Sequence, residues 1–389
     1  MTPRSALGTS APFHLEATVR VLQRRPSNPV DIWAHDRYLR VLAPPEGLVL
    51  IEVEDCGTID VPDVRFSIRA GNASSATRIG AGRVLRRILG LDLDPKPLQH
   101  LMEAEHAFRA MALALRGMRP PRFAGLFEAF ASVVPFQQLS LEAGVAIVAR
   151  MVAKFGQYLE YDGRRFYAFP TAQAIAGARL EPLRACGLSA RKAQTLRDLA
   201  RVVESGALTE DRVSSMSTGE ALRTLTALPG IGPWSAGVVL LRGFGRTDVF
   251  PPGDVGAARS LRALMRRGPH APLTRVVERF GEHRGYLYFC ALGGSLLSKG
   301  LIHPAPAHAS QRKTGRHTPT PLSELVRTDV ATVESHTRRK LRLIPEAQVP
   351  RSERTALRSE RLIRTGERNL PQEIEEPPCP PNPIGRSIR

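Results

Sequence analysis

The feature that most constrains this chain is a tight turn between two helical patterns, at Leu228–Gly232 (LPGIG). Ser217 and Glu220 have the spacing of a capping box, which begins the first helix. Two glycines bracket Ile231, an apolar residue that can pack back into the core. Pro233 suits the first position of the second helix, because its missing N–H would be unpaired there. The stretch therefore predicts a helix, a glycine hairpin and a helix.

Such a hairpin can bind a phosphate through its backbone. Gly230 and Gly232 allow close approach, and the N–H groups around Ser235, at the start of the second helix, carry partial positive charge. The chain has 55 Lys and Arg residues against 37 Asp and Glu, a formal net charge of +18, which favours a polyanionic partner. An ordinary helix–turn–helix corner is the alternative. The charge favours docking on nucleic acid.

An aspartate follows the hairpin after twenty-two residues, in the segment 250–256 (FPPGDVG). Asp254 lies where a new helix is expected to begin, and an aspartate there usually caps the helix. That helix carries Arg259, Arg262 and Arg266 on one face. Such a stripe alone usually marks a solvated face. Its combination with the hairpin makes both features candidates for function.

Three zones of composition predict the domain organisation. Residues 12–92 predict a small α+β domain, 93–302 an almost wholly helical domain, and 303–389 a disordered basic tail rich in proline. The tail has a net charge of +6, so residues 1–302 keep +12. In the α+β domain we expect strands over Leu15–Leu22, Tyr38–Leu42, Leu48–Val53 and Val64–Ile68, and a helix over Arg78–Leu89. The predicted fold is mainly α.

Several classes of protein are excluded. The four cysteines form no Cys-x-x-Cys pair, which argues against zinc knuckles, short-spaced iron–sulfur loops and secreted disulfide scaffolds. No apolar stretch approaches the roughly 18 residues of a membrane helix. Residues 1–10 lack a signal-peptide pattern, so we expect a cytoplasmic protein.

These motifs together resemble those of a known family. Residues 228–236 (LPGIGPWSA), followed by 248–250 (DVF) and 252–254 (PGD), resemble the helix-hairpin-helix–Gly-Pro-Asp superfamily of DNA glycosylases. They are similar to its bacterial 3-methyladenine DNA glycosylase II branch. Residues 136–140 (FQQLS) resemble the Gln-Gln-Leu-Ser segment of that family, and the N-terminal α+β unit fits the extra domain of the branch. The order here is Pro-Gly-Asp.

The resemblance implies excision of alkylated purines, of the 3-methyladenine and 7-methylguanine type, after base flipping. Asp254 would be the catalytic carboxylate that stabilises an oxocarbenium-like transition state. Bifunctional members have a lysine where Trp234 stands, so a monofunctional enzyme is implied. Trp234 would stack on a cationic base.

The resemblance also assigns roles to the remaining candidates. Phe136 and Tyr286 would line the base pocket, and Gln138 would fill the gap left by the flipped base. Gly230, Gly232, Ser235 and Arg259 would contact DNA. No metal or organic cofactor is expected, although a monovalent cation could bind the hairpin carbonyls. The expected partner is double-stranded DNA, bound by a nucleoid-associated monomer.

Alternatives stay open at this stage. Trp234 could be a core anchor, Gln137 and Gln138 could cap a helix, and the aromatic residues could be plain core. The chain could be a non-catalytic protein that senses DNA damage, or a glycosylase of another lesion class. Asp254 argues against a pure binder, because a carboxylate near phosphates would only weaken binding.

Overall fold

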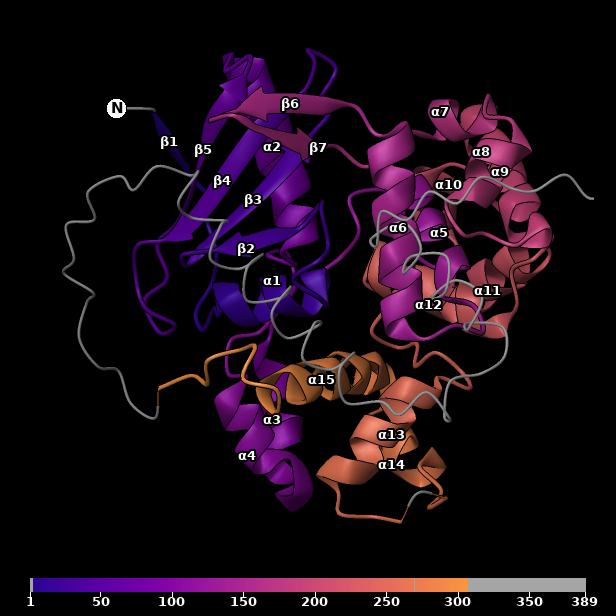
Figure 1. Cartoon of the computed structure of the whole chain (residues 1–389). Coiled ribbons are helices and arrows are strands. Elements are labelled where there is room, and N and C mark those ends of the chain that lie inside the picture. The colour runs from indigo at the N-terminus through magenta and orange to yellow at the C-terminus, as the bar shows by residue number, and fades with distance from the viewer. Residues whose placement is uncertain (1–2, 269, 307–389) are drawn as a thin grey trace, which may run out of the picture. The chain divides into compact units, whose positions relative to one another are not determined.

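Residues 3–268 and 270–306 are described by this computed structural model (Figure 1). The N-terminal elements are β1 (Arg4–Ala6), α1 (Leu15–Gln23), β2 (Ile32–Ala34), β3 (Arg37–Leu42), β4 (Val49–Asp55), β5 (Val64–Gly71) and α2 (Ser75–Ile88). The following elements are α3 (Lys96–Ala104), α4 (His106–Ala114), α5 (Leu126–Ala131), the 3-10 helix η1 (Val134–Phe136), α6 (Leu141–Phe155), β6 (Tyr158–Tyr161) and β7 (Arg164–Tyr167). The last elements are α7 (Ala172–Ala176), α8 (Leu180–Ala185), α9 (Ala190–Glu204), α10 (Glu210–Ser215), α11 (Thr218–Thr226), α12 (Pro233–Phe244), α13 (Val255–Leu264), α14 (Thr274–Arg279), the 3-10 helix η2 (Gly281–His283) and α15 (Arg284–Leu297).

The N-terminal part is an antiparallel sheet in the order β1-β5-β4-β3-β2, with α1 and α2 packed against it. The predicted strands over Tyr38–Leu42, Leu48–Val53 and Val64–Ile68 are confirmed as β3, β4 and β5. The sheet also contains β1, which pairs with β5. This strand begins eight residues before residue 12, the predicted start of the α+β domain. The predicted mainly α fold with a small α+β part is confirmed.

The predicted strand over Leu15–Leu22 is wrong, because these residues form helix α1. His14 caps the helix by accepting a hydrogen bond from the Ala17 N–H. Leu15, Val19 and Leu22 lie on one face of α1 and pack against the sheet. Ala17 and Val21 lie on the opposite face and pack into a second cluster that contains residues of α15. Because apolar residues occur on both of these faces, the sequence does not show the single apolar face that is typical of a helix.

A β-hairpin interrupts the part that we expected to be almost wholly helical. Strands β6 and β7 pair with each other, and Phe166 packs against Val41 and Leu50 of the sheet. The side chains of Val41 and Leu50 lie on the face opposite to α1 and α2, so the hairpin covers the second face of the sheet (Figure 1). The boundary predicted at residue 92 therefore does not separate two independent packing units.

A buried ion network joins the sheet to the helices. Arg40 of β3 is 2% exposed and donates to Asp31 at 2.6 Å and to Glu128 of α5 at 2.5 Å. Burial raises the pKa of Glu128, and the Arg40 charge opposes this effect. Such a network is costly to break from one side, because an unpaired buried charge would remain.

The helical part is built around α12 and α15. Ser235–Gly243 of α12 are all buried, and α15 packs against α1 and α13. The chain beyond α15 continues along the body, where His303 contacts Glu16 at 3.0 Å and the Ala305 N–H donates to the Ala114 carbonyl. Most of the predicted tail, 307–389, lies outside the described residues. Within the described part of the chain, no helix is long and apolar enough to cross a membrane.

Candidate functional site

The structure brings Asp254 and Trp234 together. Asp254 caps α13: its Oδ1 accepts a hydrogen bond from the Ala257 N–H at 2.8 Å. Its Oδ2 accepts a second hydrogen bond from the indole Nε1 of Trp234 at 2.9 Å. The carboxylate is half-buried. The cap predicted from the sequence is confirmed, and the Trp234 contact adds a fixed orientation that spacing alone could not reveal.

A glycine on α12 makes this approach possible. A Cβ atom on Gly237 would lie 3.1 Å from Cα of Pro251 and 3.2 Å from Cδ of Pro252. The proline segment therefore packs directly on the helix backbone, which brings the start of α13 to the start of α12. Gly253, at φ +74°, completes the turn into the cap, a conformation that glycine adopts without strain.

The glycine hairpin forms between α11 and α12 as predicted. Ser217 and Glu220 make both hydrogen bonds of the capping box, and Pro233 is the first residue of α12. Ile231 is 3% exposed and packs into the core. Gly230 has φ +80°, and a Cβ there would lie 2.4 Å from Oγ1 of Thr195.

The two ends of the hairpin differ in access. A Cβ atom on Gly232 would meet nothing within 4 Å, so the backbone is open on this side. The first N–H groups of α12 have no partner within the helix, as at any helix start. The side chain of Ser235 is 2% exposed, and its hydroxyl accepts a hydrogen bond from Gln137. The predicted DNA contact of Ser235 stays a prediction, which would be made by its backbone N–H.

Gln137 links the hairpin to the segment after η1. Its Nε2 donates to the Gly230 carbonyl and to Oγ of Ser235, both at 2.9 Å. Lys192 of α9 holds the same segment, because its Nζ donates to the carbonyls of Pro135 at 3.2 Å and Gln137 at 2.5 Å. Desolvation lowers the pKa of Lys192. Nothing in the sequence singled out Lys192.

Gln138 projects from this clamped segment. It is exposed and has φ +55°, an uncommon conformation for a residue other than glycine. Leu139 beside it is 45% exposed. The two side chains therefore extend from a backbone that is fixed on both sides, and the alternative that Gln138 caps a helix is wrong, because Ser140 caps α6.

The helix that Asp254 begins presents a basic face. Arg259 of α13 is exposed, and Arg262 donates to the Ala271 carbonyl at 2.8 Å. Arg266 lies beyond the helix, at φ +50°, so the expected stripe of three residues on one helical face is shortened.

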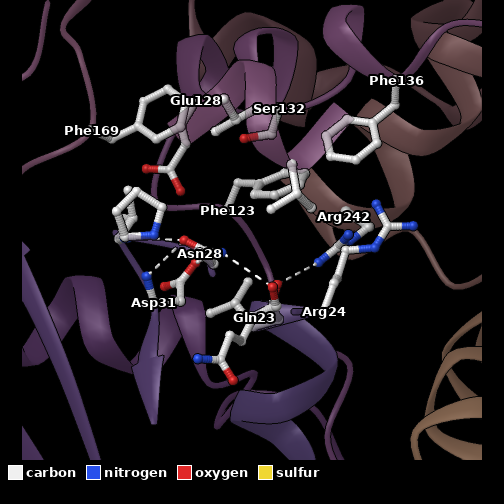
Figure 2. A pocket seen from close by; sticks show the side chains of 15 residues that line it. Gln23, Arg24, Asn28, Asp31, Phe123, Glu128, Ser132, Phe136, Phe169 and Arg242 are labelled. Carbon is white, nitrogen blue, oxygen red and sulfur yellow. Dashed lines mark hydrogen bonds between the residues drawn. The ribbon is translucent and has the colours of Figure 1, made fainter. Parts of the chain in front are cut away.

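Phe136 and Tyr286, both predicted to line a base pocket, have different environments. Phe136 lines a pocket of about 40 Å³ between α1, α5, α6 and α12, shown in Figure 2. Tyr286 is 6% exposed within the α15 core, where its hydroxyl donates to the Met118 carbonyl at 2.7 Å. Its hydroxyl is bonded and its ring packs in the α15 core, and the pocket role of Tyr286 stays a prediction.

No group of three or more His, Cys, Asp or Glu residues among the described ones could hold a metal ion. The hairpin carbonyls of Leu228 and Gly230 already accept hydrogen bonds, from Ile231 and Gln137. A monovalent cation at these carbonyls therefore stays a prediction.

Comparison with known proteins places this arrangement in a family. Residues 131–281 match the sequence profile described as "HhH-GPD superfamily base excision DNA repair protein". This range contains the hairpin, Trp234, the Gln137 segment and Asp254. Residues 131–281, which carry this site, are therefore similar to the HhH-GPD superfamily.

Two relatives of this chain carry similar names. The DNA-3-methyladenine glycosylase of Bacillus subtilis (strain 168) is 30% identical over 181 residues, which are 46% of this chain and 60% of that protein. DNA-3-methyladenine glycosylase 2 of Escherichia coli (strain K12) is 29% identical over 180 residues, 46% of this chain and 61% of that protein. The matches therefore span about three fifths of these two relatives.

A solved structure extends the similarity beyond the matched core. The 3-methyladenine DNA-glycosylase from Archaeoglobus fulgidus is 27% identical, with a TM-score of 0.62. The match covers 76% of this chain and 99% of that protein. The similarity to that protein thus extends beyond residues 131–281.

Proposed function

We propose that this chain is a monofunctional DNA glycosylase that excises alkylated purines from double-stranded DNA by hydrolysis of the N-glycosidic bond. The observation that carries the proposal is the half-buried Asp254 carboxylate, held by Trp234 and by the start of α13 beside an open glycine hairpin. The names of the relatives support the lesion class.

The chemistry follows from the position of the carboxylate. Loss of a base leaves positive charge on the sugar, and a fixed carboxylate stabilises that charge without reorganising in the transition state. A base alkylated at a ring nitrogen is already cationic and leaves readily, so little acid catalysis is needed. Trp234 and the Ala257 N–H keep the two oxygens of Asp254 in place.

Docking on DNA would use backbone groups. The open side of Gly232 and the first N–H groups of α12 can receive a phosphate, and Arg259 adds exposed positive charge on α13, the helix that Asp254 begins. Such contacts set the register of the protein on the duplex without reading sequence.

Gln138 and Leu139 would enter the duplex where the base leaves. When a base flips out, a side chain must fill the space that it leaves in the base stack. Gln138 and Leu139 suit this role because they are exposed and their backbone is held by Gln137 and Lys192. Gln137 and Lys192 act here as positioning residues, because they hold the backbone that carries this pair.

The test is release of free bases from methylated duplex DNA, measured by mass spectrometry, with strand integrity followed on a gel. We expect free 3-methyladenine and 7-methylguanine, strands that break only after alkali, and no covalent adduct on borohydride reduction. Binding without release would indicate a damage-sensing protein. Strand cleavage with a trapped adduct would indicate a lyase, and either result would overturn the proposal.

A further inference from the structure

The pocket beside Phe136 contains two arginines that no carboxylate neutralises. Arg24 follows α1 and Arg242 lies near the end of α12, and Figure 2 shows both at one end of the pocket. Neither forms an ion pair with a described carboxylate. Asp31 and Glu128 also line the pocket, but both pair with Arg40.

Arg242 is 1% exposed, and its Nε has no hydrogen-bond partner. One of its Nη atoms reaches the Leu22 carbonyl only at 3.5 Å, and its guanidinium lies 4.7 Å from the ring centroid of Phe123. Burial, and then the charge of Arg24, lower the pKa of Arg242 to about 10. A hydrogen bond with Tyr288 opposes this lowering, but a buried donor such as Nε normally has an acceptor of its own, so the unpartnered Nε points to a ligand.

Arg24 is held in a strained conformation. Its φ and ψ are +63° and −36°, outside the regions that residues other than glycine usually adopt. Its guanidinium lies 5.2 Å from the ring centroid of Phe136, and its buried Nε also has no partner. Strain of this kind commonly marks a functional position.

The pocket adjoins the elements of the Asp254 site. Trp234, Val238 and Arg242 recur at four-residue steps along α12, so they follow one side of the helix over about 12 Å. Phe136 precedes Gln137, which is bonded to the hairpin. In a purine, the sugar-bearing nitrogen and the six-position substituent lie at opposite ends. Residues that read that substituent should therefore lie away from Asp254, as Arg242 does, two turns of α12 beyond the Trp234 that contacts Asp254.

We propose that Arg24 and Arg242 recognise the six-position oxygen of a flipped purine, so that the enzyme favours six-oxopurines over purines with an amino group there. This inference rests on the proposed function. The cavity of about 40 Å³ is small, so it admits the edge of a ring. An arginine donates readily to a carbonyl oxygen but has no acceptor for an amino group.

The test compares bases that share a methyl position and differ in the six-position group. Methylated DNA supplies 3-methylguanine with 3-methyladenine, and 7-methylguanine with 7-methyladenine. In Arg24→Met, release of both guanines should fall by about ten- to a hundredfold, as expected for loss of such a pair of hydrogen bonds, while release of both adenines persists. Arg65→Met is the matched control, since Arg65 pairs with Asp63 and does not line the pocket; it should leave all four rates unchanged.

Equal loss for guanines and adenines, or no loss for either, would overturn the inference and leave the proposed function standing. Absence of release by the unmodified protein would instead overturn the proposed function. A second measurement, thermal melting with free bases, depends neither on base release nor on the folding of a variant. Free hypoxanthine should raise the melting temperature of the unmodified chain more than free adenine does, and equal shifts would overturn the inference.

Discussion

Replacing Trp234 by phenylalanine separates two roles of this residue. The ring face remains available for stacking, but the Nε1–H that donates to Asp254 at 2.9 Å is lost. The hydrogen bond from Ala257 to the other carboxylate oxygen is unaffected, so Asp254 stays at the start of α13. The substitution therefore removes the hydrogen bond to Oδ2 of Asp254 and keeps the hydrogen bond with which Oδ1 caps α13.

The size of the effect follows from that single bond. A hydrogen bond to a charged group contributes about 1.5–3 kcal/mol, and the half-buried position favours the lower value. If the bond orients the carboxylate in the transition state, its loss slows base release by about tenfold. The duplex dissociation constant should not change, because Trp234 carries no charge that a phosphate could meet.

The assay is single-turnover base release from a duplex with one alkylated purine, at saturating protein. Trp33→Phe is the control, since Trp33 is the other tryptophan of the chain and is buried in the sheet cluster. It should leave the rate unchanged. A Trp234→Phe protein that releases base at the unmodified rate would refute the orienting role of the indole N–H.

Three further outcomes are expected. Affinity for duplex DNA should fall steeply as salt rises, also for a chain ending at Pro306, and a salt-independent dissociation constant would contradict docking on phosphates. Trp234→Lys should not create strand cleavage, because an amine also needs a lowered pKa and correct placement; a borohydride-trapped adduct would disprove this. Gln137→Ala should slow base release more for a lesion that is paired with an opposite base than for an unpaired one. Equal slowing would contradict the role of Gln137 in holding Gln138.

The hairpin and the Asp254 cap could be predicted because local rules determine them. A capping box, a proline at the first helical position and glycines at a tight turn each specify backbone geometry within a few residues. The structure confirms each of these features.

Features that depend on tertiary packing were not predictable in this way. Helix α1 was read as a strand because two clusters bury opposite faces of it, and β6–β7 escaped notice because its apolar partners lie in the distant sheet. The Trp234–Asp254 bond depends on close packing at Gly237. Lys192 lies in an ordinary helix and Arg24 directly after one, and only their contacts and the backbone conformation of Arg24 single them out.

The most direct test of the central claim is single-turnover base release by Asp254→Asn. Asparagine caps helices about as well as aspartate, so only the Trp234 bond and the charge that faces the sugar are lost. The protein should fold, bind duplex DNA at least as tightly because a negative charge is removed, and release base on the order of a hundredfold or more slowly. Release at the unmodified rate would mean that Asp254 only caps α13, and it would contradict the mechanism.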